Sequence, residues 1–176
     1  MNELLKIMKN RHSVRKYSGE KVPDEMIDMI LKAGLLSPSG RAVKPWEFII
    51  IRDNIMLKKL VGARTGAADM LSGADCAIVV IADKSKTDVW VEDCSIAMTQ
   101  MHLMADSLGL GSCWIQGRNR ESFDGQTSCE YIQKLLEYPD SFELEAILSI
   151  GWPIDKRPPY EEPNAEDSPK IHRERF

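Results

Sequence analysis

Residues 88–116, DVWVEDCSIAMTQMHLMADSLGLGSCWIQ, carry the clearest structural signal in this chain. Their apolar residues recur at intervals of three and four, which predicts a helix over about 88–108. One stripe of this helix consists of Cys94, Ala97, Met98, Met101, Met104, Ala105 and Leu108. Ile96 and Leu103 lie off the stripe, so the helix is apolar on nearly all sides and is expected to be buried all round. In a chain of 176 residues this favours burial by a second subunit. The alternative is a central helix in the core of a monomer.

Four strands are predicted around this helix. Gly109 is placed to end the helix in a left-handed cap, and the strand LGSCWIQG follows it. The other predicted strands are WEFIIIR (46–52), CAIVVIAD (76–83) and ELEAILSIGWP (143–153), which ends as a strand at Gly151. The isoleucine run of 46–52 and the apolar run of 76–83 predict burial on both faces of the sheet.

Further helices are predicted at 3–10, from Asp24 to a stop before Pro38, at 54–63 and at 126–137. Asp24, after Pro23, is the expected cap of the second of these. The layout predicts one domain over residues 1–176, of the α+β class, with helices layered on a small central sheet. After Pro153 the chain is polar and rich in proline. Residues 153–176 are therefore expected to form either a disordered tail or an arm that lies on a partner.

Composition excludes several classes of function. The net charge of −4 argues against non-specific nucleic-acid binding. No apolar run approaches the ~20 residues of a membrane span, and the N-terminus lacks the apolar stretch of a signal peptide. The four cysteines are widely spaced and the three histidines scattered, so no metal site is expected. Free, buried thiols such as Cys113 fit a protein of the reducing cytoplasm, where a packing role is expected for them.

The stretch RHSVRKY, residues 11–17, concentrates positive charge without an acid. Arg11, Ser13 and Arg15 together offer two guanidinium groups and a hydroxyl, which are suited to surround a phosphate. The alternative is a solvated basic turn that pairs with nearby acids such as Glu20 or Asp24. Spacing alone leaves both interpretations open.

No familiar catalytic motif is present. The chain lacks the nucleophile elbow of hydrolases, the Walker phosphate loop, the zinc-binding H-E-x-x-H and the Rossmann glycine fingerprint. His102 is expected to be a hydrogen-bonded helix residue rather than a catalytic base. The small-residue loop SPSGRAVKP (37–45) instead lets the backbone approach a flat ligand closely.

Four segments, in order, resemble the FMN-dependent nitroreductases. They are the N-terminal Arg-His-Ser-x-Arg, SPSGRAVKPWEF, ADSLGLGSCWIQ and ILSIGWP. The resemblance covers nearly the whole chain and identifies it as a short, single-domain member of that family. It implies a three-layer fold with a central, mostly antiparallel sheet flanked by helices. It also implies an intertwined homodimer with FMN at the subunit interface.

The resemblance further implies roles for particular residues. Arg11, Ser13 and Arg15 would contact the phosphate, the ribityl chain and the ring edge, and His12 would contribute mainly its backbone. Pro38, Ser39 and Gly40, with Lys44, would belong to a loop that closes over the flavin from the partner subunit. The backbone of Gln116 and Gly117 would lie near flavin N5. Lys156 or Arg157 would contact the phosphate.

Two positions depart from the family pattern. Ala42 stands where the family often has Asn, and Lys44 where it often has Gln. Ala42 cannot make the hydrogen bond that Asn would make to the flavin ring. Lys44 either brings positive charge to the ring, which would raise the flavin potential, or points into solvent.

The activity implied by the resemblance is a ping-pong oxidoreduction. NADH or NADPH would pass hydride to flavin N5 and leave, and an electron-poor acceptor such as a nitroaromatic, quinone or activated alkene would then be reduced. No catalytic side chain is required, because N5 carries the hydride. The alternatives are a dehydrogenase or dehalogenase on the same scaffold, an FMN carrier or redox sensor without NAD(P)H turnover, and a protein that binds no flavin.

Overall fold

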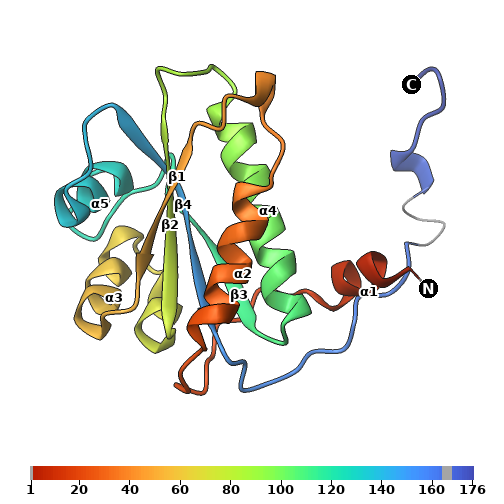
Figure 1. Ribbon diagram of the computed structural model, residues 1–176, viewed down its shortest axis with the longest axis horizontal. Helices are drawn as coiled ribbons and strands as arrows, with labels where there is room; N and C mark the ends of the chain where they lie inside the picture. Colours follow the sequence, from red (N-terminus) through yellow and green to blue (C-terminus); the bar gives the residue numbers. More distant parts are fainter. Residues whose placement is uncertain (1, 164–167) are drawn as a thin grey trace.

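The chain folds around a four-stranded antiparallel sheet (Figure 1). A computed structural model describes residues 2–163 and 168–176. The strands lie in the order β1-β2-β4-β3, and each neighbouring pair is antiparallel. Their bounds are Trp46–Ile51 for β1, Cys76–Asp83 for β2, Gly111–Gln116 for β3 and Phe142–Gly151 for β4. All four strands were predicted within a few residues of these bounds.

Helices cover both faces of the sheet and make a three-layer structure (Figure 1). α2 and α4 pack on one face, and α3 and α5 on the other. The helices are α1 (Glu3–Asn10), α2 (Asp24–Leu35), α3 (Asn54–Leu60), α4 (Trp90–Ser107) and α5 (Ser128–Leu136). Each face of the sheet therefore has its own apolar core, as expected for an α+β sandwich of this size.

The two predicted doubly buried strands differ in their burial. β2 pairs with β1 on one side and β4 on the other, and its residues 76–82 are all buried, as predicted. β1 is an edge strand, and Ile50 is 43% exposed. The prediction of burial on both faces is therefore wrong for β1. An apolar run does not reveal how far the flanking helices cover a strand at the edge of the sheet.

Two helix predictions also need correction. Pro23, not Asp24, occupies the N-cap of α2, and Asp24 is the first helical residue. α4 ends as predicted, with Gly109 in a left-handed conformation at φ +77°. However, α4 is not buried on all sides within one chain, because Ile96 is 40% exposed. The apolar side of α4 that carries Ile96 is left open by the rest of the chain.

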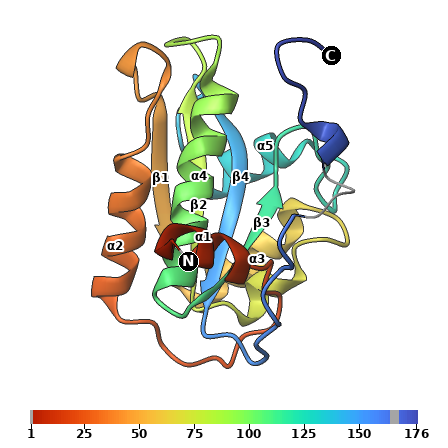
Figure 2. The same ribbon diagram turned by 90° about the vertical axis from the view of Figure 1, so that its right-hand side faces the viewer.

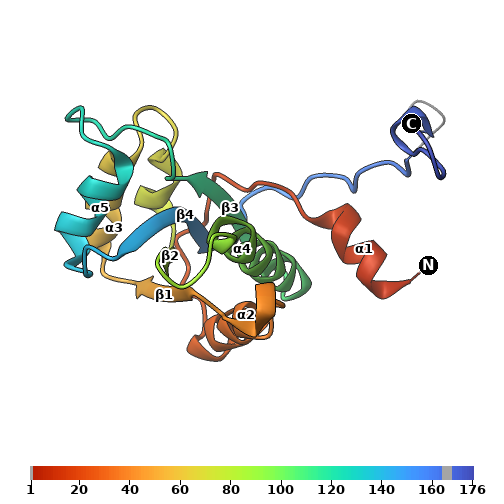
Figure 3. The same cartoon turned by 90° about the horizontal axis from the view of Figure 1, so that it is seen from above.

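The two ends of the chain extend together from the body (Figures 1 and 3). α1 contains no buried residue, and its Leu4, Leu5 and Met8 are exposed. The extended C-terminal segment lies beside α1: the N–H of Tyr160 donates to the Lys9 carbonyl at 2.9 Å, and Lys9 pairs with Glu162 at 2.7 Å. Within residues 2–163 and 168–176, no helix combines the length and apolar character needed to cross a lipid bilayer.

Candidate functional site

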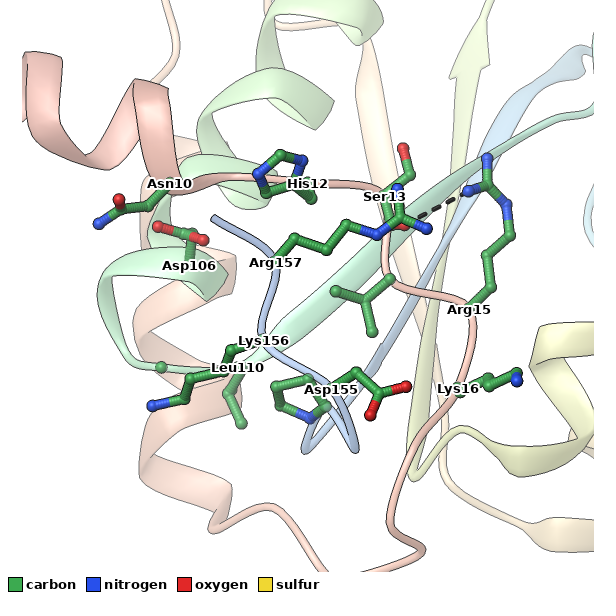
Figure 4. A pocket seen from close by; sticks show the side chains of 13 residues that line it. Asn10, His12, Ser13, Arg15, Lys16, Asp106, Leu110, Asp155, Lys156 and Arg157 are labelled. Atoms are coloured by element: carbon green, nitrogen blue, oxygen red, sulfur yellow. Dashed lines mark hydrogen bonds between the residues drawn. The ribbon is translucent and has the colours of Figure 1, made fainter. Parts of the chain in front are cut away.

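A cavity of about 660 Å³ lies where the N-terminal segment, the turn between α4 and β3, and the C-terminal segment meet (Figure 4). Its charged lining is dominated by cations. The cationic side chains around it are Arg15, Lys16, Lys156 and Arg157, and the carboxylates are Asp106 and Asp155. His12 and Ser13 also line it. Both alternatives for the late basic residue, Lys156 and Arg157, thus reach the cavity that the RHSVRKY motif borders.

The motif is held there by backbone pairing with β3. After α1 ends, Ser13 forms a parallel bridge with Ser112, and the Val14 N–H donates to the Ser112 carbonyl at 2.9 Å. Gly111 makes this approach possible, because a Cβ at that position would lie 2.6 Å from Val14. The motif is therefore an extra strand-like segment on the start of β3, and not a free basic turn.

Tyr17 fixes the end of the motif. Its hydroxyl lies 2.8 Å from the Val14 carbonyl and 2.8 Å from Ser149 Oγ on β4. Burial raises the pKa of Tyr17, so the phenol stays protonated. Tyr17 also bridges to Pro153, where the C-terminal segment begins. One buried residue thus holds both walls of the cavity to the sheet.

Arg11 does not line this cavity. Its Nη1 donates to Nε2 of His102, on the buried side of α4, at 3.0 Å. The other ring nitrogen, Nδ1, is hydrogen-bonded to Ser112 Oγ. Burial, together with the Arg11 cation, lowers the pKa of His102 to about 4. His102 is therefore a neutral, hydrogen-bonded helix residue, which confirms the prediction made for it.

Arg15 and His12 have different surroundings. Arg15 Nη1 donates to the Ser13 carbonyl at 3.3 Å, which leaves its other N–H groups available (Figure 4). His12 bonds the Pro158 carbonyl at 2.9 Å and lies against the Tyr160 ring, with centroids 4.2 Å apart. The His12 side chain thus holds the C-terminal segment beside the cavity.

The loop that contains Pro38, Ser39, Gly40 and Lys44 lies near the start of α4, at the opposite end from the cavity (Figure 2). The Gly40 N–H donates to Asp93 at 2.8 Å. Asp93 precedes Asp106 of the cavity by 13 helical residues, which correspond to about 20 Å. One chain therefore does not bring this loop to the cavity.

This loop has an unusual backbone. Arg41, Ala42 and Lys44 all have positive φ, at 53°, 57° and 50°. Non-glycine residues adopt this region at a cost, and such strain is concentrated at functional sites. The Lys44 N–H donates to Ser39 Oγ at 2.9 Å, and Asp93 holds Gly40. The loop is thus held by short polar contacts in a conformation that its sequence does not favour.

Gln116 and Gly117 lie at the end of β3 far from Ser112. The predicted free N–H of Gly117 is not available, because it donates to the Glu145 carbonyl at 3.1 Å. The Ser112 carbonyl points away from β4 and accepts from the Val14 N–H. Backbone groups alternate in direction along a strand, so the N–H of Gln116, four residues later, also points away from β4, to the open edge of β3. Gln116 therefore presents the N–H that this segment can offer a ligand.

Asp93 was not found by sequence reasoning. It is buried among the apolar residues of α4, and its Oδ2 has no hydrogen-bond partner in the described part of the chain. The signal was present: Asp93 precedes Ala97 and Met101 at intervals of four, so it stands on the apolar side of the predicted helix. A carboxylate at such a position indicates a specific partner, which here is the loop N–H of Gly40.

Comparison with known proteins settles the family. The sequence profile of the Nitroreductase family matches residues 8–63 and 54–152, most of the chain. The chain belongs to the nitroreductase family. The resemblance predicted from its four motifs is thereby confirmed, and the three-layer antiparallel fold agrees with structures solved for this family.

Full-length relatives of this nitroreductase-family chain support the assignment. An FMN-dependent nitroreductase from Clostridium difficile R20291 is 43% identical, with a TM-score of 0.92 over 98% of this chain and 99% of that one. A protein of Archaeoglobus fulgidus, whose provisional name is NADH dehydrogenase/NAD(P)H nitroreductase, is 39% identical over the full length of both chains. A provisionally named nitroreductase from Desulfovibrio desulfuricans, solved with FMN, is 26% identical, with a TM-score of 0.79 over 100% of this chain and 99% of that one.

Proposed function

We propose that this chain is an FMN-dependent oxidoreductase that takes hydride from NADH or NADPH and reduces electron-poor acceptors. The observation that carries the proposal is the cation-lined cavity at the start of β3. The named activities of its full-length relatives support it: one is called an FMN-dependent nitroreductase and another an NAD(P)H nitroreductase.

The residues of the cavity suit a flavin phosphate. Arg15, Lys156 and Arg157 line it with Ser13, so charged N–H donors and a hydroxyl surround one space. From Ser112 to Gln116 the strand advances by about 13 Å, since each residue adds roughly 3.3 Å. A ligand with its phosphate in the cavity would thus lie along the open edge of β3, with its ring near the Gln116 N–H.

A second copy of the chain would complete the site. The loop with Pro38, Ser39, Gly40 and Lys44 is too far from the cavity of its own chain, so we propose that it covers the flavin of the partner. The exposed Ile96 on α4 and the uncovered apolar side of α1 supply surface for such a homodimer. We propose further that the arm, residues 153–176, lies on the partner subunit.

The bound flavin would supply hydride chemistry at its N5 atom. The protein groups have simpler tasks. Arg15, Lys156 and Arg157 neutralise and orient the phosphate, and the Gln116 N–H donates to the ring. Lys44 adds positive charge near the ring if its side chain turns inward. We assign no acid or base to a side chain of the site, and solvent supplies the protons.

Dehalogenation is a second candidate within the same chemistry. An iodotyrosine deiodinase from Thermotoga neapolitana is 26% identical over 91% of this chain and 94% of its own. A carrier or sensor of FMN is the third candidate, and Ala42 favours it because alanine removes a side-chain hydrogen bond from the loop.

Anaerobic reduction of the purified, FMN-loaded protein tests the proposal. We expect NADH or NADPH to bleach the flavin absorbance within seconds, and a nitroaromatic or quinone to restore it. Iodotyrosine in place of these acceptors tests dehalogenation. Flavin that stays oxidised with both nicotinamides would favour the carrier or sensor, and failure to bind FMN would contradict all three.

A further inference from the structure

Arg11 is held by a neutral base and not by a carboxylate. In the described part of the chain its guanidinium donates to His102 Nε2 at 3.0 Å and has no carboxylate within ion-pair distance. His102 is only 7% exposed. A half-buried arginine is ordinarily paired with an acid, so this choice of partner calls for an explanation.

The hydrogen bonds define the tautomer of His102. Arginine has donors and no acceptor, so Nε2 must be the unprotonated nitrogen. Nδ1 then carries the proton and donates it to Ser112 Oγ. Ser112 is itself fixed in β3, where its carbonyl accepts from Val14. The imidazole is thus held from both sides, by the sheet and by Arg11.

This arrangement leaves Arg11 without a carboxylate in direct contact in the described part of the chain. A carboxylate at position 102 would orient Arg11 equally well, but it would cancel the charge that attracts an anion. The low pKa of His102, about 4, keeps the ring neutral at neutral pH. Arg11 also lies beside the cavity: its chain neighbours Asn10 and His12 line it, and its cation partly offsets the rise that burial gives to the pKa of Asp106, another lining residue.

We propose that His102 is a positioning residue for phosphate binding: its neutral imidazole, held by Ser112, keeps Arg11 at the edge of the cavity with its remaining N–H groups free for the flavin phosphate. The inference rests on the proposed function, since it takes FMN as the ligand. It assigns His102 a task beyond packing, although the side chain does not itself line the cavity.

Two substitutions separate positioning from packing. In His102→Gln the side-chain amide reaches the place of Nε2 and can still accept from Arg11. In His102→Asn it reaches only the place of Nδ1, so Arg11 loses its acceptor while a buried amide is retained. Each full-length apoprotein is titrated with FMN and with riboflavin, which lacks the phosphate. Quenching of flavin fluorescence reports the two dissociation constants, and circular dichroism reports folding.

For His102→Asn we expect the Kd for FMN to rise about tenfold and the Kd for riboflavin to stay within about twofold of wild type. For His102→Gln we expect both constants near wild type. If His102→Asn does not fold, Ser112→Ala is measured instead, and a selective loss of FMN affinity is again expected.

Equal losses for FMN and riboflavin, or no loss for either, would overturn the inference and leave the proposed function intact. Wild-type protein that binds neither flavin would overturn the proposed function, and this inference with it.

Discussion

Arg11 and Arg15 are four residues apart, yet they meet different partners. Arg11 turns to the buried His102 of α4, whereas Arg15 lines the cavity and donates to the Ser13 carbonyl. Their difference arises because the motif leaves a helix and joins a strand edge within a few residues. At the scale of single residues, the site depends on how each charge is partnered and not only on how many charges are present.

Replacement of Arg11 by alanine should weaken FMN binding. A charge-assisted hydrogen bond contributes about 1.5–3 kcal/mol, so the Kd should rise about 10- to 100-fold. Lys86→Ala removes the same charge from an exposed loop and serves as the control. Fluorescence titration of both variants measures the effect, and equal affinities would refute a role for Arg11 at the phosphate.

His102 should make the stability of the apoprotein depend on pH. Its pKa is lowered from 6.5 to about 4 by burial and by Arg11, with Ser112 as its other partner and Asp106 one turn away on α4. Between pH 6.5 and pH 4, His102 is protonated in the unfolded chain but neutral in the folded one. The free energy of unfolding therefore decreases as the pH falls through this range. From pH 7 to pH 5 the loss due to His102 is about 2 kcal/mol.

Urea unfolding at the two pH values, compared with His102→Gln, isolates this contribution. The carboxylates titrate alike in both proteins, so only the difference between them is assigned to His102. Identical pH dependence in the two proteins would mean that His102 is not buried in its neutral form.

At the scale of elements, α4 carries a contact to the cavity region at one end and a contact to the 38–44 loop at the other. Near its C-terminal end, Asp106 lines the cavity and His102 accepts from Arg11 beside it, and near its start Asp93 holds the loop at Gly40. Because both contacts come from one rigid helix, the cavity and the loop have a fixed separation within a chain. The strained loop depends on that attachment.

Asp93→Ala should free the loop at residues 38–44. The Gly40 N–H loses its acceptor, and the positive φ of Arg41 is no longer held in place. We expect trypsin to cleave after Arg41 several-fold faster, while cleavage after Lys21, in the exposed segment that precedes α2, stays unchanged. Mass spectrometry of timed digests gives both rates. Equal acceleration at the two sites would indicate general unfolding and not release of the loop.

At the scale of the whole molecule, our proposal is that two copies of the chain complete the flavin site. The cavity and the 38–44 loop lie at opposite ends of α4, and α1 and the described part of the C-terminal segment extend from the body together (Figure 3). A homodimer would bring the loop of one copy to the cavity of the other and would cover the exposed side of α4. Loss of the homodimer should therefore also disrupt the flavin site.

Light scattering should give a mass twice that of the 19.9 kDa chain. Ile96→Glu places a charge on the open side of α4, so we expect monomers that lose FMN. Ile55→Glu is the matched control, because Ile55 is 68% exposed and lies in the first turn of α3, on the other face of the sheet. A wild-type monomer that still binds FMN would contradict the shared site.

The sequence by itself determined the elements and the family. Helical periodicity predicted α4 and apolar runs predicted the strands, because the spacing of apolar residues indicates which side of each element is buried. Four short motifs in order identified the nitroreductase family. Only the tertiary structure decided which strand lies at an edge, that the Gly117 N–H is already paired with Glu145, and that Arg11 rests on His102. These features depend on contacts between residues far apart in the chain, and no local pattern encodes which distant group will meet a given N–H or guanidinium.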